Sequence, residues 1–463
     1  MRIHHFFPLI SFLFLFSFGY SLNLTLSDYH NPAANHILDA EVVGDVLIVS
    51  AMVQGIEFYD ISNPGNLNHL TNFNLSGGGW GGTQSNCVRA EGNYAYFTSN
   101  NGNGLFVVNI SNPSNPQSLG SVSNTSNLLL ENLDLEENTL AVCAHSDGVL
   151  LFDISNPANP IQTSTIETNN AWAVALAGGY AYISDDENIL IVNVNDIHSP
   201  SFINQVQTTN AVKDLVVYNN YLYAALGSDG VDIYDLVDPQ NPQYLDNYNT
   251  TTMAHRIALS GNKLAVADWD DVEVLEWNGE SLNRVGYKNT GNRTMAIAAK
   301  EEFIYSAEWA SVQVFEFGEI AGPDIDLSTW ELNYPYVENG YSYSLSLDII
   351  NNGNTTLTNT DNYTTNSEFT VINPLTSLNP GETQTVEIIY TASNANASGA
   401  YRIYSNDADE PEIICETNGN IDGANIGEPA PDFDLDYMAN GTGSFQLSDH
   451  LGEIVVIAFF SPG

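Results

Sequence analysis

The chain has 463 residues, of which 43% are hydrophobic, and it carries 56 Asp and Glu residues against only 10 Lys and Arg residues, a formal net charge of −46. A charge of this sign and size repels nucleic-acid phosphates and anionic lipid surfaces, so we exclude both as partners. The three cysteines, Cys87, Cys143 and Cys415, form no C-x-x-C or zinc-type spacing. They predict neither a disulfide framework nor a metal site or cofactor.

The first residues are typical of an exported protein. Arg2 precedes the apolar run FFPLISFLFLFSF, which is too short to span a bilayer, and small residues stand at its end and just after it, at Ser17, Gly19 and Ser21. We predict a cleaved signal peptide at residues 1–21, with a retained signal anchor as the alternative. The mature protein is then expected to be periplasmic, cell-surface or secreted, with no transmembrane segment after signal cleavage.

A repeat organises residues 28–318. Its first anchor is a turn followed by a short apolar strand, as in GDVLIVSA and GNYAYFTS. Its second anchor is a β-branched strand that breaks into a Pro-rich turn, as in GIEFYDISNP and GVLLFDISNP. The first anchor occurs seven times, starting at Gly44, Gly92, Glu137, Gly178, Asn219, Gly261 and Glu301.

Each copy contains four strand signals. The residues two and four positions before the first anchor are apolar, which marks a half-buried strand, and a further strand follows most Pro turns. Four short antiparallel strands in about 40 to 48 residues are typical of a β-propeller blade. We therefore predict an all-β protein whose main body is a seven-bladed β-propeller. The last copy lacks its outermost strand, and the stretch SLNLTLSDY after the signal peptide is free to supply it.

The sequence motif of the repeat resembles that of the LVIVD-repeat propeller family. It is a strand of the type L-x-I-V-D followed by I-S-N-P-x-N-P. The resemblance covers residues 28–318. It implies an exported or surface module for binding or scaffolding.

Residues 322–421 differ in character from the repeat. Alternating strands with Asn-Gly and Pro-Gly turns predict a β-sandwich. The phrases NNGNTTLT, LNPGETQTVEIIY and YSNDADEPEI resemble immunoglobulin-like domains of the abnormal-spindle and hydin type, which implies a spacer or adhesion role.

Residues 426–463 resemble the start of redoxins, the thioredoxin-like family of alkyl hydroperoxide reductases and thiol-specific antioxidants. The first matching element comprises Gly427, Ala430, Pro431, Asp432, Phe433 and Leu435, and the second comprises Leu447, Ser448, Asp449 and Gly452. Residues 455–460 match the buried strand that precedes the reactive cysteine in that family. We expect an incomplete thioredoxin-like α/β segment from a truncated sequence, with the cysteine encoded within about three further residues of the intact gene.

Several polar positions are better explained by structure than by chemistry. Cys143 aligns with small residues of other copies, so we expect it to be buried and inert. Asp60, Asp153 and Asp235 share one repeat position at the end of a strand, which favours side-chain to backbone hydrogen bonds.

One set of residues remains a candidate binding site. Propellers bind ligands at the mouth of their central channel, where the innermost strands begin. The aligned mouth positions hold Trp172, Lys213, Asp214, His255 and Arg256. We predict that they bind a small anionic or carbonyl-bearing ligand; the alternative is chance placement with charge balance. No catalytic residue, metal or cofactor is predicted.

Two functions follow as hypotheses. The first is an exported binding or scaffold protein with an unknown protein or small-molecule ligand at the propeller face. The second is an extracytoplasmic peroxiredoxin or thiol-disulfide oxidoreductase with antioxidant activity, formed by the intact gene product.

Overall fold

The computed structural model describes residues 22–319 except 33–35, 53–54, 76–84 and 100–103, residues 322–420 except 330, 394–396 and 409, and two short strands near the C-terminus. The chain divides into two units, one comprising the residues up to Ala321 together with Asn352–Asn354, and the other comprising the remaining residues from Gly322 onward. All regular elements in the described ranges are β-strands, as the sequence predicts. No helix of the length and hydropathy needed to cross a membrane occurs in these ranges.

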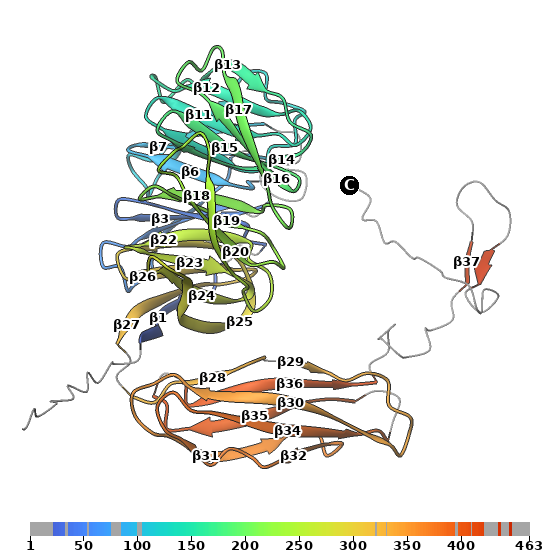
Figure 1. Ribbon diagram of the computed structural model, residues 1–463. Coiled ribbons are helices and arrows are strands. Elements are labelled where there is room, and N and C mark those ends of the chain that lie inside the picture. Colours follow the sequence, from blue (N-terminus) through green and yellow to red (C-terminus); the bar gives the residue numbers. More distant parts are fainter. Residues whose placement is uncertain are drawn as a thin grey trace, which may run out of the picture. The chain divides into compact units, whose positions relative to one another are not determined.

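The first unit contains five antiparallel sheets of four strands each, and each sheet is formed by consecutive strands (Figure 1). The sheets comprise β2 (Asp39–Val43), β3 (Val46–Ala51), β4 (Gly55–Asp60) and β5 (Asn68–Phe73); β6 (Val88–Glu91), β7 (Tyr94–Phe97), β8 (Phe106–Asn109) and β9 (Gln117–Ser121); β10 (Leu133–Glu136), β11 (Thr139–Cys143), β12 (Val149–Asp153) and β13 (Ile161–Ile166); β14 (Ala171–Ala177), β15 (Tyr180–Asp185), β16 (Asn188–Asn193) and β17 (Ser201–Gln207); and β18 (Asp214–Tyr218), β19 (Tyr221–Ala225), β20 (Val231–Asp235) and β21 (Gln243–Tyr248).

The sixth sheet has seven strands because the long strand β25 (Leu282–Lys300) takes part in two layers. Its first part pairs with β24 (Trp269–Trp277), which continues to β23 (Lys263–Ala267) and β22 (Arg256–Ser260). Its second part pairs with β26 (Phe303–Glu308), followed by β27 (Val312–Glu319). The pairing of β25 with β24 shifts register between Asn289 and Thr294, and its pairing with β26 shifts between Thr294 and Ala296.

The outermost strand of this sheet comes from the other end of the unit. Strand β1 (Leu22–His30) pairs antiparallel with β27, from Leu22 opposite Glu319 to His30 opposite Val312, and Figure 1 shows the two side by side. The prediction that the stretch after the signal peptide supplies this strand is confirmed.

Apolar clusters fill the spaces between neighbouring sheets. One of them joins Ala40 and Tyr59, from the first sheet, to Ala296 and Tyr305, from the last layer of the sixth. The first and last layers of the unit therefore pack against each other. A hydrogen bond adds to this contact, because the hydroxyl of Tyr305 donates to the carbonyl of Pro64 at 2.9 Å.

The Pro-rich turns have the same role between other layers. Tyr96 donates its hydroxyl to the carbonyl of Pro157 at 3.1 Å, and Tyr182 donates to that of Pro239 at 3.0 Å. In each pair the tyrosine belongs to one layer and the proline to the next. The strand-ending positions also behave as predicted: the carboxylates of Asp60, Asp153 and Asp235 each accept a backbone N–H two residues later.

The second unit consists of two sheets over one apolar cluster. The first sheet contains β28 (Ile325–Leu327), β30 (Ser342–Asn351), β34 (Thr383–Thr391) and β32 (Phe369–Ile372), and the second contains β29 (Glu331–Asn333), β36 (Glu412–Gly419), β35 (Ala397–Ser405), β31 (Leu357–Thr364) and β33 (Ser377–Leu378). Leu347 and Val386 from the first sheet share the cluster with Tyr401, Ile403 and Cys415 from the second.

Two predictions fall on residues that lie outside the described ones. The signal peptide at residues 1–21 is one of them. The other is the redoxin-like segment at 426–463, for which the structure describes only the backbone pairing of β37 (Asp434–Asp436) with β38 (Ser444–Gln446).

Candidate functional site

Residues of the innermost strands line a polar cavity of about 390 Å³ inside the first unit. Its charged lining residues lie five or three positions before the repeat turn. They are Asp39 and Glu41 from β2, Arg89 from β6, Asp214 from β18 and Arg256 from β22. Apolar residues of β18, β22 and β25 complete the wall.

Asp39 is the centre of an ion-pair network in this cavity. Its Oδ2 accepts hydrogen bonds from Nη1 of Arg89 at 3.1 Å and from the thiol of Cys87 at 2.8 Å. Its Oδ1 lies 3.8 Å from Nε of Arg256. Burial lowers the pKa of Arg256, but the charges of Asp214 and Asp39 outweigh burial and raise that pKa overall. Both arginines are therefore held as cations among carboxylates.

The carboxylates of the cavity also connect neighbouring layers through the backbone. Asp39 accepts from the N–H of Val88 at 2.9 Å, and Asp214 accepts in the same way from Ile257 at 3.1 Å. Outside the cavity lining, Asp134 of β10 accepts from the N–H of Leu176 in the same way at 2.7 Å. These bonds give the carboxylates a structural role, because each one satisfies an N–H on the next innermost strand.

Glu41 makes the stability of this unit depend on pH. Burial raises the pKa of Glu41 to about 7, although the charge of Arg89 lowers it. The folded state therefore favours the protonated carboxyl. This contribution to stability is complete below the unfolded-state pKa of about 4.5 and is lost as pH rises through about 7.

We expect the Glu41→Gln variant to lose less thermal stability than the wild type when pH rises from about 5 to about 8. Thermal unfolding followed by circular dichroism at several pH values measures this difference. Glu91→Gln, on an exposed residue of β6, is the control and should retain the wild-type slope. Parallel pH profiles for wild type and Glu41→Gln would contradict the assignment.

The three cysteines are buried and free, as expected for inert residues. Burial raises the pKa of Cys87 and of Cys143 well above the ordinary value and raises that of Cys415 to about 12. None of these three thiols offers a thiolate at neutral pH.

The predicted site residues divide between this cavity and a second place. Asp214 and Arg256 line the cavity, whereas Trp172 and Lys213 contact each other, with Nζ of Lys213 lying 5.4 Å from the centre of the indole ring. His145 lies edge-on to the same indole at 5.3 Å and pairs with Glu131 at 3.6 Å. The hydrogen bond that His145 donates to Glu131 raises the pKa of His145, which favours its protonated form.

The contacts continue from Lys213 across the next layers. Burial, with the positive charges of Arg256 and Lys213, lowers the pKa of His255 to about 3, so this ring is neutral. His255 lies edge-on to Trp269 at 6.3 Å, and the guanidinium of Arg293 lies 5.2 Å from the centre of the Trp269 ring. We call Trp172, Lys213, His255, Trp269 and Arg293 the channel rim.

Three of the five predicted residues thus belong to the channel rim, and two belong to the ion-pair network. The sequence analysis missed Arg89 and Glu41, because it considered the positions five and six before each turn and not the position three before it. It also missed Trp269, the first residue of β24, and Arg293, within β25, because neither occupies one of these positions. The signal that could have found Trp269 is its place just after an aligned strand, next to three acidic residues.

Comparisons with known proteins agree with this architecture. Residues 82–125, 139–168, 169–208 and 211–250 match the LVIVD repeat model. No curated protein sequence matches the chain. Among solved structures, the Myceliophteria thermophila Cps50 (Swd1) β-propeller domain is similar with a TM-score of 0.50 and 11% identity, over 64% of this chain and 99% of that one. A chain of the Mitotic Checkpoint Complex is similar with a TM-score of 0.52 and 11% identity, over 64% of this chain and 96% of that one.

At this level of identity the solved structures show the fold alone. The repeat match covers about a third of the chain and falls on strands that form consecutive sheets of the first unit. The prediction of LVIVD repeats in a β-propeller is confirmed, and the chain carries such repeats within a propeller fold.

Proposed function

We propose that the chain is an exported binding protein whose propeller holds an anionic ligand at the channel rim. The five four-stranded sheets and the two layers joined by β25 are then seven blades. The second unit, which we interpret as an immunoglobulin-like sandwich, serves as a spacer. Export is supported by the signal-like sequence at residues 1–21.

The observation that carries the proposal is that two cationic side chains are not paired with a carboxylate. Within the described ranges, Lys213 and Arg293 have no carboxylate partner, although the chain has 56 acidic residues and only 10 basic ones. Arg89, Arg256, Lys263, Arg284, Lys300 and Arg402 are each paired with an Asp or Glu. Both unpaired cations lie over tryptophan rings of the channel rim.

This arrangement fits a particular kind of ligand. Lys213 and Arg293 can form charge-assisted hydrogen bonds with carboxylates. Trp172 and Trp269 are partly exposed, and the buried indole N–H of Trp172 has no hydrogen-bond partner in the protein. A ligand with more than one carboxylate and an apolar face meets both requirements, and oligomers of uronic acids belong to this class.

Titration of the full chain with trigalacturonate tests the proposal, with tryptophan fluorescence and calorimetry as readouts. We expect saturable binding that weakens at high salt, and a loss of at least about tenfold in affinity in Lys213→Met and in Arg293→Met. Lys263→Met is a matched control, because Lys263 also lies 5.4 Å from an aromatic ring, that of Phe317, but pairs with Glu276. Equal affinities in all four proteins, or equal binding of uncharged maltotriose, would refute the proposal.

A second candidate is a thiol-dependent redox function, supported by the resemblance of residues 427–460 to redoxins. The three cysteines of the chain are buried and protonated, so this function requires a further cysteine after the apolar stretch 455–460. A gene product with that cysteine should reduce insulin disulfides in a thiol-coupled assay, and a Cys→Ser change there should abolish the activity.

A further inference from the structure

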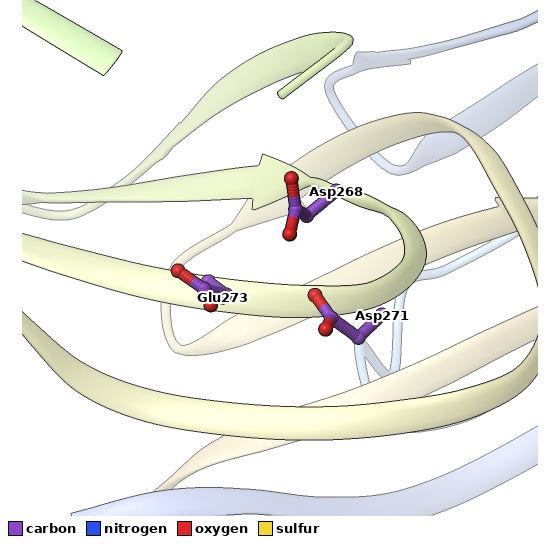
Figure 2. Close-up of side chains that lie close together, drawn as sticks. All are labelled: Asp268, Asp271 and Glu273. Carbon is purple, nitrogen blue, oxygen red and sulfur yellow. The ribbon is translucent and has the colours of Figure 1, made fainter. Parts of the chain in front are cut away.

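Three buried carboxyl groups meet at the hairpin between β23 and β24, on the layer that also carries Trp269. They belong to Asp268, Asp271 and Glu273, whose exposed fractions are 0%, 2% and 0% (Figure 2). One oxygen of each group lies within 4.8 Å of one oxygen of each of the others. The tight turn holds them there: the N–H of Asp268 donates to the carbonyl of Asp271 at 3.0 Å.

The protein satisfies only one oxygen of each carboxyl group. The Thr251 hydroxyl lies 2.9 Å from Oδ2 of Asp268 and 2.6 Å from Oδ2 of Asp271 and shares its one proton between them, and Oδ2 of Asp268 also accepts from the N–H of Thr252 at 2.7 Å. Arg284 donates to Oε1 of Glu273 at 3.1 Å. The remaining oxygens, Oδ1 of Asp268, Oδ1 of Asp271 and Oε2 of Glu273, are buried without a hydrogen-bond partner.

Equivalent positions in other copies of the repeat are satisfied by the protein. Asp185, which aligns with Asp268, accepts from the backbone N–H groups of Asn169 and Asn170 and from the Asn169 amide. Glu57, which aligns with Glu273, has both oxygens bound, by His69 and Asn72.

The third carboxyl group is specific to this copy. Where Asp271 stands, four other copies have a glycine with positive φ: Gly55, Gly104, Gly148 and Gly230. The free oxygens therefore occur where the sequence departs from its own repeat, and they are not a general property of the fold.

Charge at the cluster is also unbalanced. Three carboxyl groups share one guanidinium, that of Arg284, which forms its ion pair with Glu273. Buried charges are stable when they are paired or bind a metal ion. Hard cations prefer carboxylate oxygens, and a Ca²⁺ ion with ligands at 2.3–2.6 Å holds its oxygens at most about 5 Å apart. One oxygen of each of the three groups lies within this distance of the other two.

We propose that Asp268, Asp271 and Glu273 bind one Ca²⁺ ion through the oxygens that the protein leaves without partners. The ion neutralises the cluster and connects the turn to β24. None of the three carboxyl groups belongs to the channel rim, although Trp269 of the rim lies between Asp268 and Asp271 in the same turn, so Ca²⁺ binding is tested without the rim ligand. Three carboxylates in a buried site favour Ca²⁺ over Mg²⁺, since Mg²⁺ retains several water ligands.

Calorimetry and thermal unfolding of the full chain with CaCl₂ at 0.15 M KCl test the site, after removal of bound ions with EDTA. We expect one tight Ca²⁺-binding site per chain. We also expect a rise in Tm of about 5 °C when free Ca²⁺ is about 100-fold above Kd. Asp271→Asn should abolish the tight site and the rise in Tm. Its Tm without Ca²⁺ should equal or exceed that of the wild type, because a buried charge is removed.

Asp232→Asn is the matched control. Asp232 is a buried carboxylate that aligns with Glu273 in another copy, and both of its oxygens accept hydrogen bonds, from Tyr234 and from Asn247. This variant should retain the Ca²⁺ response. The proposal fails if Asp271→Asn and the wild type respond equally, if the wild type shows no tight site, or if Mg²⁺ gives the same rise in Tm as Ca²⁺.

Discussion

Replacing Arg256 with alanine is expected to destabilise the propeller by about 3–5 kcal/mol, the range typical of a buried ion pair that loses one partner. The side chain of Arg256 is 5% exposed and that of Asp39 is 3% exposed. The variant leaves Asp39 and Asp214 buried with less compensating charge, and it removes the hydrogen bond from Arg256 to the carbonyl of Lys213 at 3.2 Å. Denaturant unfolding followed by fluorescence measures the change, because Trp172, Trp269, Trp277 and Trp309 all lie in the propeller.

Arg402→Ala is the control for this experiment. Arg402 forms an ion pair with Glu412 in the second unit, but both side chains are about one-third exposed, at 32% and 34%. Exposed pairs contribute about 0–1 kcal/mol, so the free energy of unfolding of the propeller should not change in this variant. A loss of less than about 1 kcal/mol in Arg256→Ala would show that the cavity is hydrated enough to screen its charges, and would contradict the structural role given to the network.

Replacing Leu24 with alanine is expected to destabilise the propeller by about 2–5 kcal/mol. Leu24 is fully buried in a cluster with Ile304 and Phe315, although it comes from the opposite end of the unit. Its loss leaves a cavity between β1 and the neighbouring layers, and it weakens the pairing that covers the edge of β27.

Ser27→Ala is the matched variant on the same strand, because Ser27 is exposed, and it should stay within about 0.5 kcal/mol of the wild type. Tm measured by circular dichroism compares the two variants. If Leu24→Ala has the same Tm as the wild type, β1 does not stabilise the propeller. Deletion of Leu22–His30 is expected to have a larger effect than the point variant, since it also exposes the backbone N–H and C=O groups of β27.

The sequence predicted the architecture of the first unit well, because a propeller repeats one local pattern. Each copy has turn residues, alternating apolar positions and a Pro-rich turn, so each copy confirms the alignment of the others. The hydrogen bonds of Asp60 and Asp153 could be predicted from that alignment alone. The hydrogen bonds of the tyrosines between layers could not be predicted. Tyr182 donates to the carbonyl of Pro239 in the next layer, and nothing in either segment specifies the partner.

The site was harder to predict for the same reason. Alignment shows which residues are equivalent, but it does not show which side chains line the cavity and which contact the aromatic rings of the channel rim. Lys213 and Asp214 are adjacent in sequence, yet one contacts an indole and the other lines the cavity. The cluster around Asp271 was missed because it arises where the repeat is broken, and an argument from repeats gives least weight to such positions.

The pairing of β1 with β27 has a consequence for the order of events during synthesis. The ribosome makes the segment at Leu22–His30 before any other part of the propeller, but its partner at Val312–Glu319 is made last. Bringing together segments so distant in sequence is slow and entropically unfavourable until the intervening layers have formed. The first strand must therefore wait with an unpaired edge, and a partner that covers this edge in the meantime, such as a chaperone, would protect the nascent chain from aggregation.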